Sequence, residues 1–254
     1  MNDQPSRDHY SYSKYADPAT ARTFDEQRFG GAVGELLAER QAEVLTSFGG
    51  DLRNQRVVDV GTGTGRVARV FAAAGAHVTG VDASEAMLAV AARRAADRHD
   101  GLSITFLRGD AHALDFPDRS FDVAVSVRVL MHTPQWRVAL AELCRVADRL
   151  VIIDFPSARS AALLQSAARR AARACGAQTE AYRVFTDSQI ARALAQSGFR
   201  VRAAHRQFAL PIALHKAIGS ARFTIAVERL LRRTGIVRLV GSPVTLVAER
   251  CASS

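Results

Sequence analysis

The feature that most constrains the fold is a glycine-rich turn between a short apolar run and an amphipathic segment. Residues 56–60 read RVVDV, residues 61–65 read GTGTG and residues 66–75 read RVARVFAAAG. Glycine lets the backbone turn sharply at the end of a strand and approach a ligand closely. A helix that begins there directs unpaired N–H groups at the same ligand. The pattern predicts a strand, a ligand-binding turn and a helix in succession.

Strand and helix patterns continue to alternate along the chain. Apolar runs predict further strands over 77–82, 104–110, 121–130, 149–155, 199–208 and 242–250. Helical patterns lie over 84–98, 134–147, 157–176 and 186–198, and another over 210–235 is interrupted at Gly219. We expect Ser84 to cap the helix over 84–98, and Thr186 or Asp187 to cap the helix over 186–198. This alternation predicts an α/β fold, a doubly wound sheet with helices on both faces.

The chain divides into three parts of a single domain. Residues 1–50 hold a polar segment with Tyr10, Tyr12 and Tyr15, and then a helix expected over 21–48. The tyrosine-rich segment is either a tail or a lid that folds over a site, and the sequence leaves both open. Residues 51–156 contain the glycine turn and five strands. Residues 157–254 contain two more strands with a helical insertion at about 209–241.

Composition excludes several classes of protein. The three cysteines, Cys144, Cys175 and Cys251, are far apart, so neither a disulfide framework nor a zinc ribbon is expected. No apolar run approaches the ~18 residues of a membrane span. The first ten residues lack the apolar core of a secretory signal. We therefore expect a cytoplasmic protein.

The net charge of +9 raises the question of a polyanionic partner. Only Lys14 and Lys216 are lysines, so 32 of the 34 basic residues are arginines, spread over many predicted helices. Two basic helical faces stand out, around 159–173 and 222–233. In the second, an apolar face is expected from Phe223, Val227, Leu230 and Leu231, with Arg222, Arg229 and Arg233 opposite. Such a helix is an ordinary surface helix packed on its own core, or it lies on the anionic inner face of a membrane, or it covers an apolar pocket as a substrate lid.

The residues around the turn narrow the choice of ligand. Asp82 ends the second strand, seventeen residues beyond Gly65, where an acidic side chain can bind both ribose hydroxyls. Arg66 stands where dinucleotide-binding turns have a third glycine, which argues against a nicotinamide or flavin cofactor. Asp59 would repel a pyrophosphate and suits a ligand that carries an ammonium group.

The segments DVGTGTG (59–65), GVDAS (80–84) and RGDAHALDFPDRSFDVAVS (108–126) resemble class I S-adenosylmethionine (SAM)-dependent methyltransferases of the type 11 and quinone-biosynthesis-like branch. The resemblance covers about residues 55–155. It implies a Rossmann-like seven-stranded sheet, mostly parallel with an antiparallel last strand, an N-terminal helical lid and a late helical cap. It also implies SAM as the cofactor, S-adenosylhomocysteine as its product, and no metal.

The same resemblance implies which residues bind SAM. The residues of the glycine turn that would bind the methionine end of SAM are Asp59, Gly61, Thr62, Gly63 and Gly65. The residues that would surround the ribose and adenine of SAM are Asp82, Ala83, Met87, Asp110, Ala111 and His112. Those at the end of the fourth strand are Val127 and Arg128.

The stretch after the fourth strand lies beneath the transferred methyl group in similar proteins. His132 in this stretch is the candidate general base or substrate-orienting residue; the alternatives are packing against the cofactor and capping the next turn. Arg128 either clamps a carboxylate, of SAM or of an acidic substrate, or is solvated. Tyr15, Arg28 and Tyr182 are further candidates for substrate contact.

The expected function is methyl transfer to oxygen or carbon of a small, lipophilic or aromatic acceptor. Nucleic-acid amino-methyltransferases carry an Asp/Asn-Pro-Pro-aromatic motif after the fourth strand, and this chain has Arg128-Val129-Leu130-Met131 there. Cys144 is expected in mid-helix, away from the strand tips where a cytosine-directed nucleophile would stand. One alternative is a SAM-binding regulatory or partner subunit without catalysis, and a more remote one is an RNA-directed methyltransferase.

Overall fold

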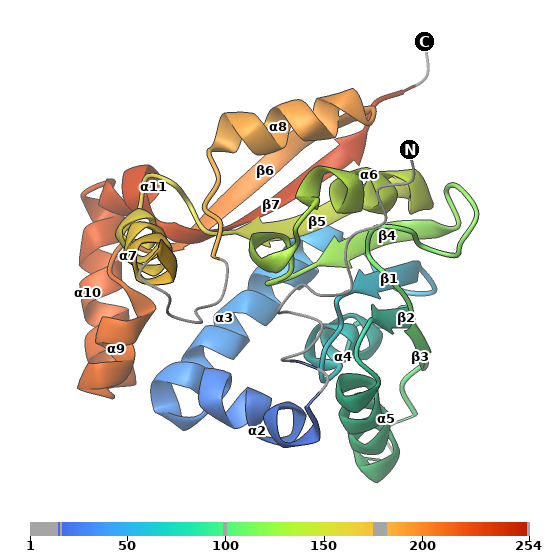
Figure 1. The fold of residues 1–254 in the computed structure, drawn as a ribbon, viewed down its shortest axis with the longest axis horizontal. Helices are drawn as coiled ribbons and strands as arrows, with labels where there is room; N and C mark the ends of the chain where they lie inside the picture. The colour runs from blue at the N-terminus through green and yellow to red at the C-terminus, as the bar shows by residue number, and fades with distance from the viewer. Residues whose placement is uncertain (1–14, 16, 99–100, 175–181, 253–254) are drawn as a thin grey trace.

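The expected sheet is present in the computed structural model, which describes residues 15, 17–98, 101–174 and 182–252. Seven strands lie in the order β3-β2-β1-β4-β5-β7-β6 (Figure 1). Their bounds are β1 (Arg56–Val60), β2 (His77–Asp82), β3 (Ile104–Arg108), β4 (Phe121–Ser126), β5 (Ala147–Phe155), β6 (Phe199–Phe208) and β7 (Ser242–Arg250). Strands β1 to β5 pair in parallel, and β7 is antiparallel to both β5 and β6. The Rossmann-like sheet with an antiparallel last strand is therefore confirmed.

Helices cover both faces of this sheet. On one face pack α6 (Trp136–Val146) and α8 (Asp187–Gln196), and on the other α3 (Gly31–Gly49) and α4 (Arg66–Ala73) (Figure 1). Helix α5 (Glu85–Arg98) contacts β2 and β3. Val57 and Val58 of β1 belong to the cores on opposite faces, and both are fully buried. Burial on both faces explains why consecutive residues of this strand are apolar.

The single helix expected over 21–48 is wrong, because the chain breaks at Gly30 and Gly31. Helix α2 (Pro18–Phe29) ends at Gly30, whose backbone is extended, and α3 begins at Gly31 with φ +74°. A Cβ on Gly30 would lie 2.4 Å from the carbonyl oxygen of Glu26. The break lets α2 turn away from α3 and contact α5. Tyr10 and Tyr12 lie outside the described residues.

The C-terminal part follows the expected order with one addition. Helices α7 (Ala162–Ala174), α9 (Ile212–Ile218) and α10 (Ala221–Arg233) were expected, and Gly219 separates the last two with φ +70°. The short helix α11 (Ile236–Val240) was not expected. The Thr186 hydroxyl accepts from the Gln189 amide, while the Gln189 side chain accepts from the Thr186 amide, so the expected cap is confirmed as a capping box.

Helix α10 packs partly through polar residues, which the sequence analysis did not single out. Glu228 is buried and accepts hydrogen bonds from the amides of Ala209 (2.9 Å) and Leu210 (3.0 Å). Its Oε1 also lies 2.9 Å from Nε2 of His215 in α9. A buried carboxylate with these three partners is satisfied, and it ties α10 to α9 and to the end of β6.

The four apolar residues expected on one face of α10 differ in burial. Val227 and Leu231 are half-buried, whereas Phe223 and Leu230 are exposed beside the row of Arg222, Arg229 and Arg233. No helix in the described part of the chain is long and apolar enough to cross a membrane.

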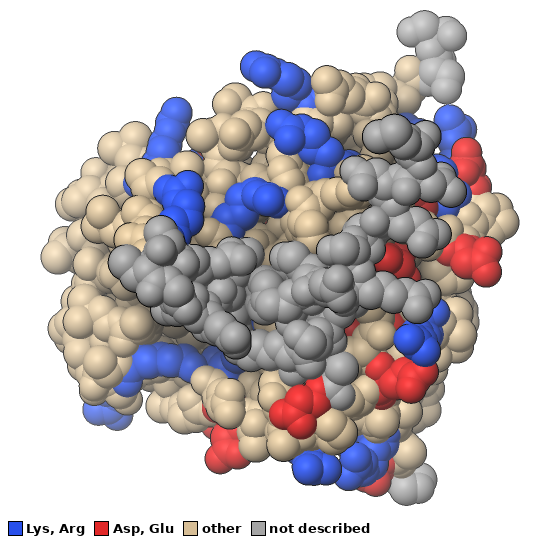
Figure 2. All heavy atoms as spheres, viewed as in Figure 1, with Lys and Arg blue, Asp and Glu red and all other residues tan. Residues whose placement is uncertain are grey.

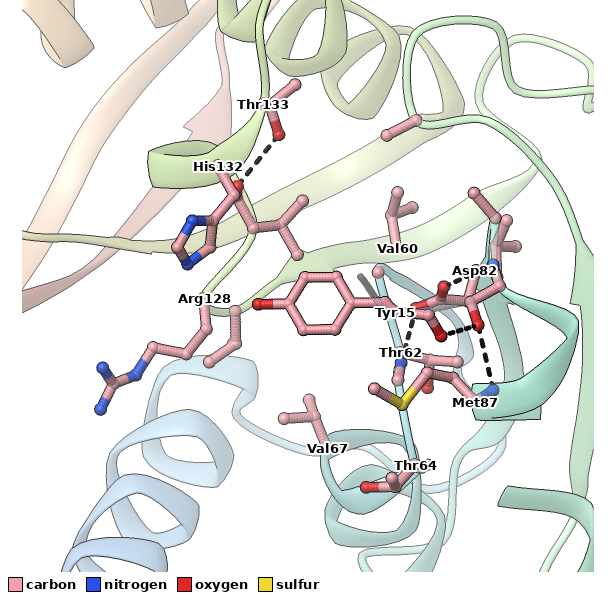
Figure 3. Close-up of a pocket in the computed structure, with 18 of the residues that line it drawn as sticks. Tyr15, Val60, Thr62, Thr64, Val67, Asp82, Met87, Arg128, His132 and Thr133 are labelled. Carbon is pink, nitrogen blue, oxygen red and sulfur yellow. Dashed lines mark hydrogen bonds between the residues drawn. The ribbon is translucent and has the colours of Figure 1, made fainter. Parts of the chain in front are cut away.

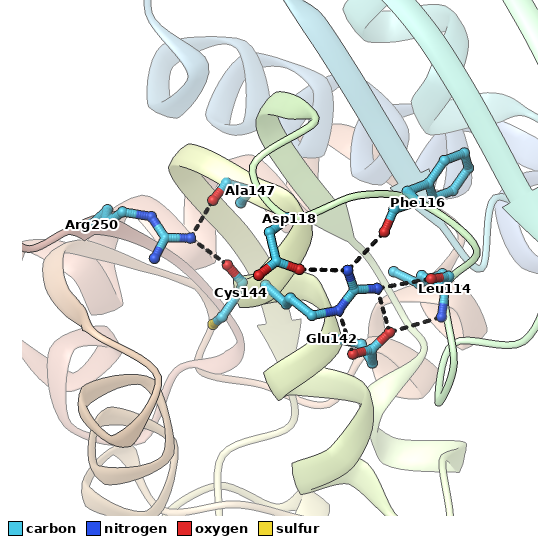
Figure 4. Close-up of polar contacts among 8 residues, drawn as sticks. Leu114, Phe116, Asp118, Glu142, Cys144, Ala147 and Arg250 are labelled. Atoms are coloured by element: carbon cyan, nitrogen blue, oxygen red, sulfur yellow. Dashed lines mark hydrogen bonds and ion pairs between the residues drawn. The ribbon is translucent and has the colours of Figure 1, made fainter.

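Arg145 at the end of α6 anchors the loop that follows β3. Its guanidinium donates to the carbonyl oxygens of Leu114 (2.8 Å) and Phe116 (2.7 Å), and it pairs with Asp118 and Glu142 (Figure 4). The hydrogen bond from Arg145 holds the pKa of Glu142 below its usual value. Because the loop leads from β3 to β4, this network fixes one wall of the site described below.

Candidate functional site

A cavity lies at the carboxyl ends of the parallel strands, where the strand order changes direction between β1 and β4 (Figure 3). Open α/β sheets bind ligands at this point. The turns after β1, β2, β3 and β4 form its walls, and α2 with Tyr15 covers it. Of the residues expected at the site, those that line the cavity are Tyr15, Arg28, Gly61, Thr62, Gly63, Asp82, Ala83, Met87, Asp110, Ala111, His112, Val127, Arg128 and His132.

The glycine turn has the left-handed backbone that only glycine adopts without strain. Gly61, Gly63 and Gly65 have φ of +76°, +56° and +78°. A Cβ on Gly61 would lie 2.2 Å from Cγ2 of Val129, so this turn touches the segment after β4. A Cβ on Gly63 would meet no atom within 4 Å, and Gly63 lines the cavity. The turn is therefore packed against protein at Gly61 and open to a ligand at Gly63.

Asp82 stands at the tip of β2 and holds the turn from the side. Its Oδ2 accepts from the Gly63 amide at 2.8 Å and its Oδ1 accepts from the Ser84 amide at 2.9 Å. Burial raises the pKa of Asp82, and these amide hydrogen bonds oppose the increase. Ser84 caps α5 as expected, since its hydroxyl accepts from the Met87 amide at 3.1 Å.

Two residues expected at the ligand, Asp59 and Gly65, do not line the cavity. Asp59 is 1% exposed beneath the turn, where its carboxylate accepts from the Thr62 hydroxyl at 2.7 Å. Burial raises the pKa of Asp59 to about 7. A Cβ on Gly65 would lie 2.9 Å from Cζ of Phe106, so this glycine lets α4 pack closely on the sheet. Both residues support the turn from behind.

The wall after β3 carries a paired carboxylate and imidazole. Asp110 Oδ1 lies 2.7 Å from Nδ1 of His112 and accepts from the His112 amide at 2.9 Å. The His112 ring is buried, while the Asp110 side chain is 40% exposed. Asp110 is therefore partly accessible, and it lines the cavity together with Ala111 and Met87.

The opposite wall is formed by the segment after β4. His132 is 7% exposed in the one-turn helix η1 (Leu130–His132) and lines the cavity. Its ring meets the ring of Tyr182 edge to face, with centroids 6.3 Å apart. Tyr182 itself is not among the residues that line the cavity; it contacts His132, and its contact with the substrate stays a prediction.

Arg128 is held by a buried carboxylate. Its backbone has φ +65°, and its amide donates to Oδ1 of Asp154 at 2.5 Å. Nε of Arg128 lies 3.5 Å from Oδ2 of Asp154, which is fully buried at the end of β5. Burial raises the pKa of Asp154, and Arg128 opposes this. Arg128 lines the cavity with about a quarter of its side chain exposed, and its pairing with Asp154 means that it is not freely solvated.

The contacts that close the cavity were missed by the sequence analysis. Asp25 of α2 accepts from the Thr64 hydroxyl and pairs with Arg94 of α5. The Ser84 hydroxyl donates to the backbone oxygen of Tyr15 at 2.5 Å. Asp25 carries a signal in the sequence, because it is an acidic residue within the N-terminal helical lid that the resemblance implies.

The residues present fit SAM. Asp82 at the tip of β2 suits a ribose, and Asp110 suits an exocyclic amine. The open space at Gly63 admits the methionine portion, and Arg28 and Arg66 in the lining offer cations for its carboxylate. Within the described ranges, no three His, Cys, Asp or Glu side chains are placed to hold a metal ion.

Comparisons with known proteins agree with this geometry. Residues 57–149 match the family model described as "Methyltransferase domain". The chain is 39% identical over 130 residues to the demethylmenaquinone methyltransferase of Thermus thermophilus, covering 44% of this chain and 58% of that protein. It spans only about half the length of the first curated relatives it matches.

Two further likenesses extend over more of the chain. The magnesium protoporphyrin IX methyltransferase (ChlM) of Synechocystis PCC 6803, solved with bound SAM, has the same fold, with a TM-score of 0.63 over 97% of this chain and 99% of that one at 19% identity. The demethylmenaquinone methyltransferase of Tropheryma whipplei is 32% identical over 181 residues, which cover 65% of this chain and 74% of the relative. The chain therefore belongs to the class I SAM-dependent methyltransferases, in the type 11 branch.

Proposed function

We propose that this protein transfers a methyl group from SAM to an oxygen or carbon atom of a small, apolar or aromatic acceptor. The observation that carries the proposal is the layout of one cavity, with Asp82 and the open Gly63 at one end and His132 and Arg128 at the other. Relatives named as quinone and porphyrin methyltransferases support an acceptor of this class.

The residues of the turns hold the cofactor in this proposal. Asp82 accepts from the ribose hydroxyls, and Met87 and Ala111 pack against the adenosine. Asp110 accepts from the adenine amine. When bound, SAM supplies a methyl group on a positively charged sulfur, and a nucleophile in line with the carbon–sulfur bond displaces the sulfur as it takes the methyl group.

Residues of the segment after β4 contact the acceptor in this proposal. The acceptor's oxygen or carbon atom would have to lie in line with the methyl group that bound SAM would supply. His132 takes the proton that the acceptor loses, because an imidazole accepts protons near neutral pH. Arg128, fixed by Asp154, stabilises negative charge that develops on the acceptor. Tyr15 and α2 exclude water and hold the acceptor near the methyl group.

The direct test is turnover with a panel of acceptors. Purified protein is incubated with SAM and phenols, hydroxyquinones, hydroxylated porphyrins and carbon acids, and products heavier by one methyl group are sought by mass spectrometry. Formation of S-adenosylhomocysteine in step with one such product supports the proposal. In a deletion strain, a metabolite lighter by one methyl group would identify the natural acceptor.

A SAM-binding subunit without catalysis is the competing function. Calorimetry with SAM separates the two when it is run beside the turnover assay. Binding of SAM without turnover of any acceptor, and without a missing methyl group in the deletion strain, would overturn the proposed activity in favour of a binding role.

A further inference from the structure

The cap helices expose an unusual number of large apolar side chains. We define the cap surface as the exposed apolar residues of α9, α10 and α11, namely Leu214, Ile218, Phe223, Leu230, Ile236 and Leu239. Leu230 and Leu239 are 61% and 64% exposed. Phe223 and Leu230 lie seven residues apart, on one side of α10, and α11 packs against α10. Exposed apolar side chains on neighbouring helices are typical of an interaction site.

Packing of the cap does not explain these residues. The buried side of α10 is built from Thr224 and Glu228, which bond to His215, and from half-buried aliphatic residues. The exposed apolar groups point away from this contact, so the fold does not need them where they are. They are available to something outside the chain.

The charged residues of the same segment are nearly all basic. Residues 209–241 contain six basic residues and one acidic residue, Glu228, which is 6% exposed. The five arginines among them are all exposed. In Figure 2 the end of the molecule that carries α9 and α10 shows blue and tan spheres and no red ones on its visible face. The outer face of the cap therefore presents cations beside apolar side chains.

The cap is joined to the lid over the cavity. Nζ of Lys216 in α9 donates to the carbonyl oxygens of Gln27 (3.0 Å) and Arg28 (2.8 Å) at the end of α2. Arg28 lines the cavity. A surface that binds the cap therefore comes to lie next to the helix that covers the site.

We infer that the cap surface docks on an anionic lipid bilayer, with Phe223, Leu230 and Leu239 in the headgroup and acyl boundary and the arginines at the phosphates. Arginines beside exposed apolar groups on short helices have the chemistry of an interfacial anchor. A second copy of the chain is a poorer occupant, because it would bring two strongly positive segments together. Nucleic acid is also a poorer occupant, since it would leave the apolar groups in water. The inference goes beyond the proposed reaction, and its test measures binding, not turnover.

Vesicle co-sedimentation tests the inference with the full chain. Vesicles of phosphatidylcholine alone are compared with vesicles that contain phosphatidylglycerol. We expect binding to the anionic vesicles only, weakened by raised salt. An Arg222→Glu/Arg229→Glu variant should bind at least about tenfold more weakly, since each cation near the surface contributes about fivefold. A Leu230→Ser/Leu239→Ser variant should also lose at least about tenfold, through the lost apolar contact.

Matched controls lie at the opposite edge of the sheet. Leu107 in β3 is 42% exposed and Arg93 in α5 is exposed, so Leu107→Ser and Arg93→Glu make the same chemical changes away from the cap. Both should bind vesicles like the wild type, and all variants should keep the wild-type melting temperature. Equal binding to the two vesicle types, or equal binding by cap and control variants, overturns the inference. So does light scattering that shows a dimer dissociated by Leu230→Ser/Leu239→Ser, because the cap surface would then be a subunit contact.

Discussion

The hydroxyl of Thr64, in the glycine turn, lies 2.9 Å from both carboxylate oxygens of Asp25 in the lid helix α2. The same carboxylate pairs with Arg94 of α5. One side chain thus joins the lid, the turn and the helix that follows β2. Because Asp25 itself lines the cavity, we expect this contact to hold α2 in place over the site.

Replacing Asp25 with alanine is expected to loosen the lid. The Thr64 hydroxyl and Arg94 lose their shared partner, at about 1–3 kcal/mol for a hydrogen-bonded charged group. Amides of residues 18–29 should exchange hydrogen faster, and the dissociation constant of SAM should rise about fivefold or more. Hydrogen exchange with mass spectrometry and calorimetry measure the two effects. Glu26→Ala, at the exposed neighbouring position, is the control, and equal exchange in both variants would show that Asp25 does not hold the lid.

Asp82→Ala is expected to weaken SAM binding at least tenfold, about 1.4 kcal/mol or more. The change removes the proposed acceptor for the ribose hydroxyls and also frees the Gly63 amide. Titration calorimetry with SAM measures the affinity. Asp51→Ala removes an exposed carboxylate before β1 and should leave the affinity unchanged. Unaltered binding by Asp82→Ala would falsify the proposed ribose site.

Three glycine-to-alanine variants separate backbone strain from steric contact. Gly61, Gly63 and Gly198 all have left-handed φ, which costs alanine about 1–2 kcal/mol. Only at Gly61 would the new Cβ collide with protein, at 2.2 Å from Val129, so Gly61→Ala should destabilise by about 2–5 kcal/mol. Gly63→Ala and Gly198→Ala should destabilise equally and mildly, because neither meets an atom within 4 Å.

The same series tests the site. Gly63 lines the cavity and Gly198 lies before β6, so only Gly63→Ala should weaken SAM binding. Urea unfolding and calorimetry provide both measurements. Equal SAM affinity of these two variants would show that the ligand does not approach the turn at Gly63.

Local patterns predicted the sheet well because its strands are buried on both faces. The apolar runs, and the glycines or caps that end them, depend on neighbours in sequence; the capping box at Thr186 and Gln189 is an example. The break at Gly30 and Gly31 was missed because the helical pattern continues through it. The role of Glu228 was missed for a different reason, since its partners Ala209 and Leu210 lie 18 or 19 residues away.

In the site, too, features set by neighbouring residues were predicted and contacts between distant residues were missed. The glycine turn and Asp82 were recognisable because their spacing is local to one βαβ unit. The contact of Asp25 with Thr64 joins residues 39 apart, and that of Arg128 with Asp154 joins residues 26 apart. Such pairs depend on how the lid and the strand ends meet in space. Asp59 was assigned to the ligand from its position before the turn, whereas its side chain points to the buried side of that turn.

Asp59→Asn is expected to change the pH dependence of stability. Burial raises the pKa of Asp59 from 3.8 to about 7, so between these values the folded protein binds more protons than the unfolded chain. Stability therefore falls as the pH rises through this window, by about 2–3 kcal/mol between pH 5 and pH 7, and levels off above it. Asparagine keeps an oxygen for the Thr62 hydroxyl and does not titrate.

The measurement is urea unfolding of both proteins at pH 5 and pH 8. The stability of Asp59→Asn relative to the wild type should be higher at pH 8 than at pH 5. Asp51→Asn is the control, because the hydrogen bond from Arg53 lowers the pKa of Asp51 to about 2 and this carboxyl does not titrate between pH 5 and pH 8. A pH-independent difference between Asp59→Asn and the wild type contradicts a neutral buried carboxyl.

His132→Gln tests whether the wall after β4 moves a proton. Glutamine has a similar length and can hydrogen-bond, but it does not accept a proton near neutral pH. We expect kcat to fall by about 10²–10⁴-fold while the dissociation constant of SAM stays within about twofold. The acidic limb of the pH–rate profile should also disappear. His77→Gln, at the start of β2 with its ring bonded to the Ser103 hydroxyl, is the control and should keep full activity. A His132→Gln enzyme that loses rate but keeps the wild-type pH profile would show that His132 positions the acceptor without taking its proton.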